Sequence, residues 1–314
     1  MGEVPYRWDL VTPDQLGSLL GGTVAPDLWF LGELVECAGK VLARSGNGDL
    51  VFVGRSLDSM FDLLGGALDG TGGTRKLVRL PFSFQRAAIG AGRRWRRRPL
   101  TAGEVAHARH VLGTLGITPR SLARRDRPVT FVDVVNDGGT FGDLFGLLHD
   151  WIAEEREPWP VIRRKVRFAG VTVRRHTSPN TWRWQQHASW TGRLPARAVV
   201  NVSMPFPVWS YFGDHQTKLT RSYRPDQWVA EPPVDGVVAA LLEATGNGPG
   251  PRRDERTRQA LAEAAALVAY GRTREGRQSL ARAIAGEPAL SEPWLRTLVT
   301  DLNNRPVTDL NDRA

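Results

Sequence analysis

The clearest change of hydrophobic pattern along the chain lies between residues 128 and 153. Apolar side chains run almost continuously from Val129 to Val135, with Asp133 near the carboxyl end of the run. This is the pattern of a parallel strand that is buried on both faces. Apolar residues then recur at helical spacing, as Phe141, Leu144, Phe145, Leu148 and Ile152. The segment therefore predicts a strand, a short loop at 136–140 and an amphipathic helix in direct succession.

The rest of the chain gives further elements of an α/β protein. Strands are expected at 50–53 and within 76–84, 160–175 and 197–205, and helices near residue 12 and at 25–43, 60–64, 254–270, 273–284 and 291–302. We expect a central, mostly parallel sheet with N-terminal helices and a C-terminal helical extension. Pro232 and Pro233 mark a boundary, so the predicted regions are an N-terminal helical segment at 1–48, an α/β domain at 49–231 and a C-terminal helical region at 232–314.

The loop at 136–140 reads Asn-Asp-Gly-Gly-Thr. Its glycines permit positive φ and close approach of the backbone, so that amides at the start of the following helix can point at a phosphate. Asp133 lies just before this loop, and an unpaired carboxylate in a buried strand is energetically costly. The alternative is a plain strand, turn and helix of a parallel α/β protein that binds no ligand there.

The same segment resembles the ribose-phosphate loop of the type I phosphoribosyltransferases. In that family a hydrophobic strand leads to two acids, two apolar residues, a variable residue and then Thr-Gly-x-Thr. The residues that match are Asp133 for the second acid, Val134 and Val135 for the apolar pair, Asn136 for the variable position, and Gly138 and Thr140 for the glycine and the final threonine. The chain departs from the pattern at Val132, where the first acid is expected, and at Asp137, where the first threonine is expected.

The resemblance implies a phosphoribosyltransferase-like enzyme of the phosphoribosyltransferase fold type. Such a glycosyltransferase would move a ribosyl phosphate group between diphosphate and a nucleobase-like or other small acceptor, with Mg²⁺ as the cofactor and phosphoribosyl diphosphate as the partner ligand. Asp133 and Asn136 are then the candidate catalytic residues. The implied phosphate-binding residues are Asp137, Gly138, Gly139, Thr140 and Phe141. The implied diphosphate-binding residues are Gly54, Arg55 and Ser56, in the loop after the first strand. The implied acceptor-binding residues are Trp209, Tyr211, Phe212 and Asp214, in a late strand and loop.

Two departures from the family pattern leave a second reading open. Val132 removes one of the two carboxylates that hold the ribose hydroxyls, and Asp137 adds a negative charge where a phosphate dianion should bind. Two like charges about 4 Å apart repel by roughly 1 kcal/mol in water and roughly 4 kcal/mol at an effective dielectric of 20. Either Asp137 turns away to cap the helix, or the ligand differs from the usual one. A non-catalytic sensor of a phosphoribosyl ligand is therefore an alternative to the enzyme.

The formal net charge of +9 is carried mostly by arginine, and part of it is concentrated between residues 93 and 98. This cluster consists of Arg93, Arg94, Arg96, Arg97 and Arg98 around Trp95. It lies between the two predicted anion loops, where the family carries a mobile hood over the diphosphate. One hypothesis is therefore that the cluster forms a lid over the diphosphate. A solvated loop and a contact with nucleic acid are the others, the last giving an RNA-associated protein as an alternative function.

Composition excludes some classes of protein. A single cysteine, Cys37, gives no disulfide framework and is expected to be a small buried residue. The six histidines are dispersed, so no metal site is predicted from them. No apolar run reaches the length of a membrane span, and charged residues interrupt any apolar start. We expect a cytoplasmic protein that has no membrane partner, and the resemblance allows a homodimer. The tryptophan-rich stretch at 176–193 is either a substrate-binding insertion or a packed loop.

Overall fold

The computed structural model describes residues 10, 20–71, 75–80, 88–89, 96–97, 99–174, 182–213 and 255–304. Its centre is a five-stranded sheet with the order β2-β1-β5-β6-β7, in which every neighbouring pair is parallel. The strands are β1 (Asp49–Val53), β2 (Leu77–Leu80), β5 (Val129–Val134), β6 (Val166–Val173) and β7 (Val199–Met204). Renumbered along the chain, this is the order 2-1-3-4-5 of doubly wound α/β proteins. The predicted α/β class is confirmed.

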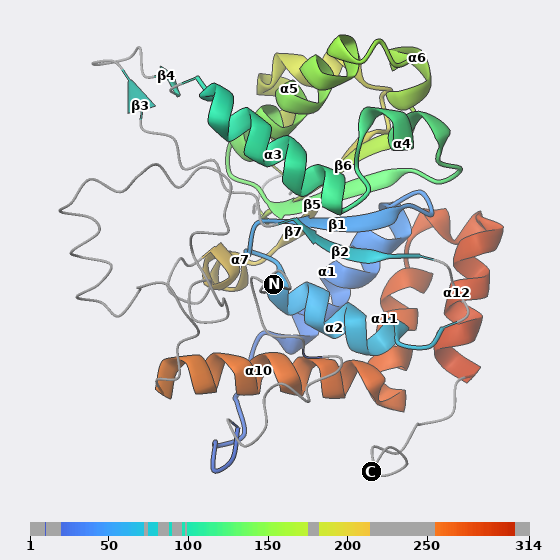
Figure 1. The fold of residues 1–314 in the computed structure, drawn as a ribbon. Helices are drawn as coiled ribbons and strands as arrows, with labels where there is room; N and C mark the ends of the chain where they lie inside the picture. The colour runs from blue at the N-terminus through green and yellow to red at the C-terminus, as the bar shows by residue number, and fades with distance from the viewer. Residues whose placement is uncertain are drawn as a thin grey trace.

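Helices cover both faces of the sheet (Figure 1). One face carries α1 (Leu31–Arg44) and α2 (Asp58–Leu68). The other face carries α3 (Ala102–Thr114), α4 (Pro119–Arg124), α5 (Gly139–Glu154) and the short α6 (Trp159–Ile162). Strand β1 is buried along its whole length, with Leu50 and Phe52 in the first core and Val51 and Val53 in the second. This explains why the central strands have continuous apolar sequences instead of an alternating pattern.

The C-terminal helices form an outer layer on α1 and α2. They are α10 (Glu255–Arg272), α11 (Arg274–Ala285) and α12 (Pro293–Asn304), close to the predicted ranges. Helix α10 crosses α2 so closely that a Cβ on Gly66 would overlap the carbonyl oxygen of Val268. A Cβ on Gly39 of α1 would lie 2.6 Å from the Cβ of Ala283. The C-terminal region therefore shares a core with the α/β body.

Several local predictions need correction. Residues 206–213, expected as a loop, form helix α7 (Phe206–Gly213) because β7 ends at Met204. Helices α3 and α4 were not predicted, and each begins with a capping box, at Thr101 and at Thr118. The helix expected near residue 12 lies outside the described residues. Strands β3 (Ala88–Ile89) and β4 (Arg96–Arg97) pair as a small antiparallel unit. Within the described part of the chain, no helix combines the length and apolar character needed to cross a bilayer.

Candidate functional site at the carboxyl edge of the sheet

The two segments predicted to bind phosphate groups follow neighbouring strands. Strand β1 pairs with β5 from Asp49 and Val129 to Phe52 and Val132, so the loops after both strands leave from the same edge of the sheet (Figure 1). Within the five-stranded sheet, β2 lies on one side of β1, and β5, the next strand of this sheet along the chain, lies on the other side. Ligands of open α/β sheets bind outside the carboxyl ends of the strands at such a switch point. The topology thus brings the residues of both loops to the expected edge.

Asp133 is the second-to-last residue of β5, and only 6% of its surface is exposed. One of its carboxylate oxygens accepts a hydrogen bond from the amide of Val134 at 2.8 Å. Its neighbour in register on β6 is Gly170. A Cβ on Gly170 would lie 2.7 Å from Nε1 of Trp184, so the missing side chain makes room for an indole beside this part of the strand. Asp133 is therefore a buried carboxylate next to a crowded tryptophan.

The loop between β5 and α5 is closed by Gly138 and Asp137. Gly138 has φ +80°, a left-handed conformation that favours glycine, and its carbonyl accepts the first helical bond from Gly142 at 2.9 Å. The Asp137 carboxylate accepts the amide of Gly139 at 2.9 Å. The N-cap residue of α5 is Gly138, so Asp137 lies one residue before the N-cap and binds the first amide of the helix. The amides of Thr140 and Phe141 stay in the first turn, where a helix offers its amides no internal acceptor.

The loop after β1 has fewer groups free to bind a ligand than its sequence suggested. Gly54 has φ +69°, and its amide donates to the carbonyl of Leu80 at 2.9 Å. That amide therefore extends the hydrogen bonding between β1 and β2 and does not point at a ligand. Arg55 is 5% exposed, which makes it a buried cation instead of a solvated loop charge. Ser56 is half-buried.

Three buried polar residues at the start of α2 were missed by the sequence analysis. Asp58, Ser59 and Asp62 are all nearly inaccessible to solvent. The two aspartates are four residues apart and so share a helix face. Their spacing did not reveal the burial, because two acids four residues apart fit a solvent-exposed helix face equally well. Together with Arg55 and Asp133 they place buried charges of both signs near the carboxyl edge, where each needs a partner.

The tryptophan-rich segment covers the ribose-phosphate-like loop. Trp182 donates its Nε1 hydrogen to the carbonyl of Asn136 at 2.7 Å. Trp184 is fully buried, and a Cβ on Gly138 would overlap its ring. The Trp184 indole also donates to Oδ1 of Asn201 at 2.8 Å, and Asn201 donates to Gln185 at 2.7 Å. For residues 182–193 the structure supports the packed loop, which holds the backbone at 136–138 in place.

The predicted acceptor-binding residues have different environments on α7. Trp209 donates to the carbonyl of Val171 at 3.1 Å, and its ring is stacked 6.5 Å from that of Phe206, which is 62% exposed. Tyr211 donates its hydroxyl to the Glu263 carboxylate and stacks on Phe30. Phe212 is buried in the core. Asp214 lies outside the described residues. Trp209 and Tyr211 each have an exposed aromatic neighbour, Phe206 for Trp209 and Trp29 for Tyr211.

The arginine cluster is described only in part. Arg96 and Arg97 form β4, whereas Arg93, Arg94 and Arg98 lie outside the described residues. Figure 1 places β3 and β4 away from the main sheet, beyond the amino-terminal end of α3. The lid and the contact with RNA therefore stay predictions.

Cys37 is buried as expected. Burial raises the pKa of its thiol to about 12, so the thiol is protonated at neutral pH and is a poor nucleophile. Among the described residues, no three His, Cys, Asp or Glu side chains are grouped as a metal site. Comparison of the chain with protein-family models, with curated proteins and with solved structures found no match.

Proposed function

We propose that the carboxyl edge of the sheet binds a phosphoribosyl ligand and that the protein is a phosphoribosyltransferase-like enzyme. The observation that carries the proposal is the position of Asp133. This buried carboxylate lies at the carboxyl end of β5, directly before a glycine loop and the start of α5, at the switch point of the sheet. A carboxylate and a helix N-terminus side by side suit a ligand with both hydroxyl and phosphate groups.

The residues would divide the ligand between them. Asp133 would accept hydrogen bonds from a ribose hydroxyl, and the amides of Thr140 and Phe141 with the Thr140 hydroxyl would bind the 5-phosphate. Ser56 would donate to the diphosphate. When the bond between C1 and the diphosphate oxygen breaks, the diphosphate leaves with the electron pair and C1 becomes oxocarbenium-like until the acceptor attacks it. Catalysis would then rest on positioning and charge stabilisation. Asn136 cannot take a proton, so the acceptor must react without a base at that position.

The residues fit Mg²⁺ only as an ion that is bound together with the ligand. Mg²⁺ is commonly held by one or two carboxylates plus substrate phosphates and keeps several waters. Asp133 offers one carboxylate, and the described residues offer no cluster of three. When bound, the ion would neutralise charge on the departing diphosphate.

One observation favours a second candidate, the non-catalytic sensor. The Asp137 carboxylate uses the Gly139 amide that a phosphate would otherwise take, and its charge repels a phosphate nearby. Both effects weaken phosphate binding in the ground state and leave fewer donors for the transition state. A sensor would bind the ligand and release no diphosphate.

The proposal is tested by isothermal titration with phosphoribosyl diphosphate and Mg²⁺, followed by a screen for diphosphate release over nucleobases. Binding with release supports the enzyme, and binding without release supports the sensor. If the wild-type chain binds neither phosphoribosyl diphosphate nor ribose 5-phosphate, the phosphoribosyl assignment is wrong.

The first variant to measure is Asp133→Asn. The amide keeps the shape and can keep the bond from Val134, but it loses a charge-assisted hydrogen bond to the ribose, worth roughly 1.5–3 kcal/mol. We expect ligand affinity to fall by about ten- to a hundredfold. Asp150→Asn is the matched control, because this carboxylate is 77% exposed on the same α5. Unaltered affinity in Asp133→Asn, with a loss of stability, would contradict the assignment.

A further inference from the structure

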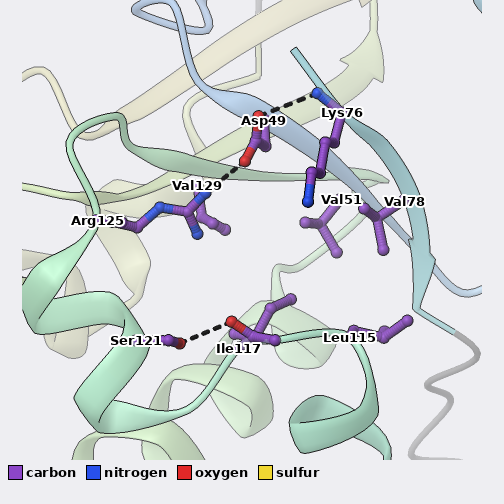
Figure 2. A pocket seen from close by; sticks show the side chains of 10 residues that line it. Asp49, Val51, Lys76, Val78, Leu115, Ile117, Ser121, Arg125 and Val129 are labelled. Atoms are coloured by element: carbon purple, nitrogen blue, oxygen red, sulfur yellow. Dashed lines mark hydrogen bonds and ion pairs between the residues drawn. The ribbon is translucent and has the colours of Figure 1, made fainter. Parts of the chain in front are cut away.

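A cavity of about 200 Å³ lies at the opposite edge of the sheet, where β1, β2 and β5 begin (Figure 2). Its apolar wall consists of Val51, Val78, Leu115, Ile117 and Val129. These side chains come from the three strands and from the turn between α3 and α4. The cavity does not include any residue of the proposed phosphoribosyl site, so a ligand bound there would be a different one.

The polar rim of this cavity contains one carboxylate, Asp49, the first residue of β1. Asp49 is 9% exposed and accepts hydrogen bonds from the amide of Lys76 at 3.0 Å and from Arg125 at 2.5 Å. Arg127 approaches the same carboxylate at 3.4 Å. Two cationic side chains thus meet at a single anion, to which Lys76 contributes only its backbone amide.

The cluster is short of negative charge. Burial lowers the pKa of Arg125, and the Asp49 charge opposes this effect only in part. The neighbouring Arg75 is also buried, and burial together with the Arg127 charge lowers its pKa to about 10. The Nε of Arg75 is buried and has no acceptor among the residues that the structure describes. An additional anion near these groups would relieve the repulsion between them.

The two cations at the cavity are arranged to receive such an anion. Figure 2 shows the Lys76 side chain, from the residue before β2, and the Arg125 guanidinium, from the end of α4, reaching toward the same space, with the apolar wall beneath them. Arg125 is fixed by two bonds, one from Nη2 to Asp49 and one from Nε to the carbonyl of Arg127 at 2.6 Å. Its Nη1 has no partner within the described part of the chain. A positioned guanidinium of this kind is a strong binder of carboxylates.

We propose that this cavity binds a small amphipathic anion, namely a carboxylate that carries a short branched aliphatic or aromatic group. Its carboxylate would lie between Arg125 and Lys76, and its apolar group would lie on the valine, leucine and isoleucine wall. The size agrees with this class, because a volume of about 200 Å³ corresponds to six or seven waters at roughly 30 Å³ each. Pockets for larger ligands are about 300–1,000 Å³, so a nucleotide is too large.

The test uses the full chain with ¹³C-labelled Ile, Leu and Val methyl groups and records methyl NMR spectra during titration. The probes are benzoate, 3-methylbutanoate and inorganic phosphate, at equal ionic strength. We expect saturable shifts of the Ile117, Leu115 and Val78 methyls with both carboxylates and at least tenfold weaker binding of phosphate, which has no apolar group. If neither carboxylate shifts these methyls, or if phosphate binds as tightly, the proposal is wrong and the cavity holds water or a simple anion.

Two variants separate specific binding from adventitious binding. Lys76→Gln removes an exposed charge and should weaken carboxylate binding by about tenfold while leaving the melting temperature unchanged. Val78→Phe fills the cavity and should abolish binding in a folded chain. Lys40→Gln is the control, because Lys40 lies on α1 and pairs with Glu36, away from the cavity. Equal affinity in the wild type and in Val78→Phe would overturn the proposal.

Discussion

The two edges of the parallel sheet hold their charged residues in opposite ways. At the carboxyl edge Asp133 accepts a bond from the amide of the next residue, and left-handed glycines and buried indoles shape the backbone around it. At the amino edge Asp49 joins the amide of Lys76 with two arginines that lie 76 and 78 residues further along the chain. The comparison teaches that the same residue type on neighbouring strands can be bound by distant arginines at one edge and by the adjacent backbone amide at the other.

The largest effect is expected when the backbone of the carboxyl edge is disturbed. Gly138→Ala puts a Cβ into a left-handed residue, at about 1–2 kcal/mol, and into the ring of Trp184, where overpacking costs about 1–3 kcal/mol. We expect the free energy of unfolding to fall by about 2–5 kcal/mol in urea denaturation. Gly146→Ala is the control, because it lies on the same helix and has no atom within 4 Å of its Cβ. It should stabilise the protein by about 0.5–1 kcal/mol. A cost below about 1 kcal/mol for Gly138→Ala would show that Trp184 does not confine the loop.

A pair of matched substitutions tests the comparison directly. Asp49→Asn leaves Arg125 and Arg127 without their carboxylate, and we expect a loss of about 2–3 kcal/mol, less than for a fully buried pair because the two arginines are partly exposed. Asp133→Asn can keep its local bond and should change the stability by less than about 1 kcal/mol. Urea denaturation of both variants at pH 7 gives the two values. Equal losses would mean that both aspartates are structural and would weaken the proposed function.

The smallest expected effect concerns the indole that holds the loop from outside. Trp182→Phe keeps an aromatic ring at this position but removes the hydrogen bond from the indole to the carbonyl of Asn136. We expect this loss to cost about 0.5–1.5 kcal/mol of stability. Trp151→Phe is the control, because it removes an exposed bond to Glu155 on α5 and should cost less. Hydrogen exchange at residues 137–141 should accelerate in Trp182→Phe and not in the control. Unchanged exchange there would show that the loop keeps its conformation without the indole.

The sequence predicted elements where the apolar pattern is strong. The strand at Val129 and the helix after it were expected within a few residues of their observed bounds. Helix α3 was missed because its buried residues are few, Ala108 and Leu112, so that it has almost no apolar face. Helix α7 was missed because Pro205 and Pro207 flank its first residue, Phe206, and prolines are typical of turns and loops.

The site could be predicted only as far as its residues are local in the sequence. The loop at 136–140 and the bond from the Gly139 amide to Asp137 involve only adjacent residues. The bond from Trp182 to Asn136 joins residues 46 apart, and the bond from Arg125 to Asp49 joins residues 76 apart. Such contacts depend on how the strands are ordered, which the pattern of one strand does not specify. The burial of Asp58 and Asp62 in α2 could not be predicted either, because their spacing also fits an exposed helix face.

The outer layer of helices affects how the chain must fold during synthesis. The outer faces of α1 and α2 are covered only by α10 and α11, and the ion pair of Arg272 with Asp69 spans 203 residues. At roughly 5–20 residues per second, a ribosome needs about 10–40 s to make the intervening chain. Throughout that interval the apolar surface of α1 and α2 stays exposed, and closing so long a loop is slow. The nascent chain therefore exposes an apolar surface until its last helices emerge.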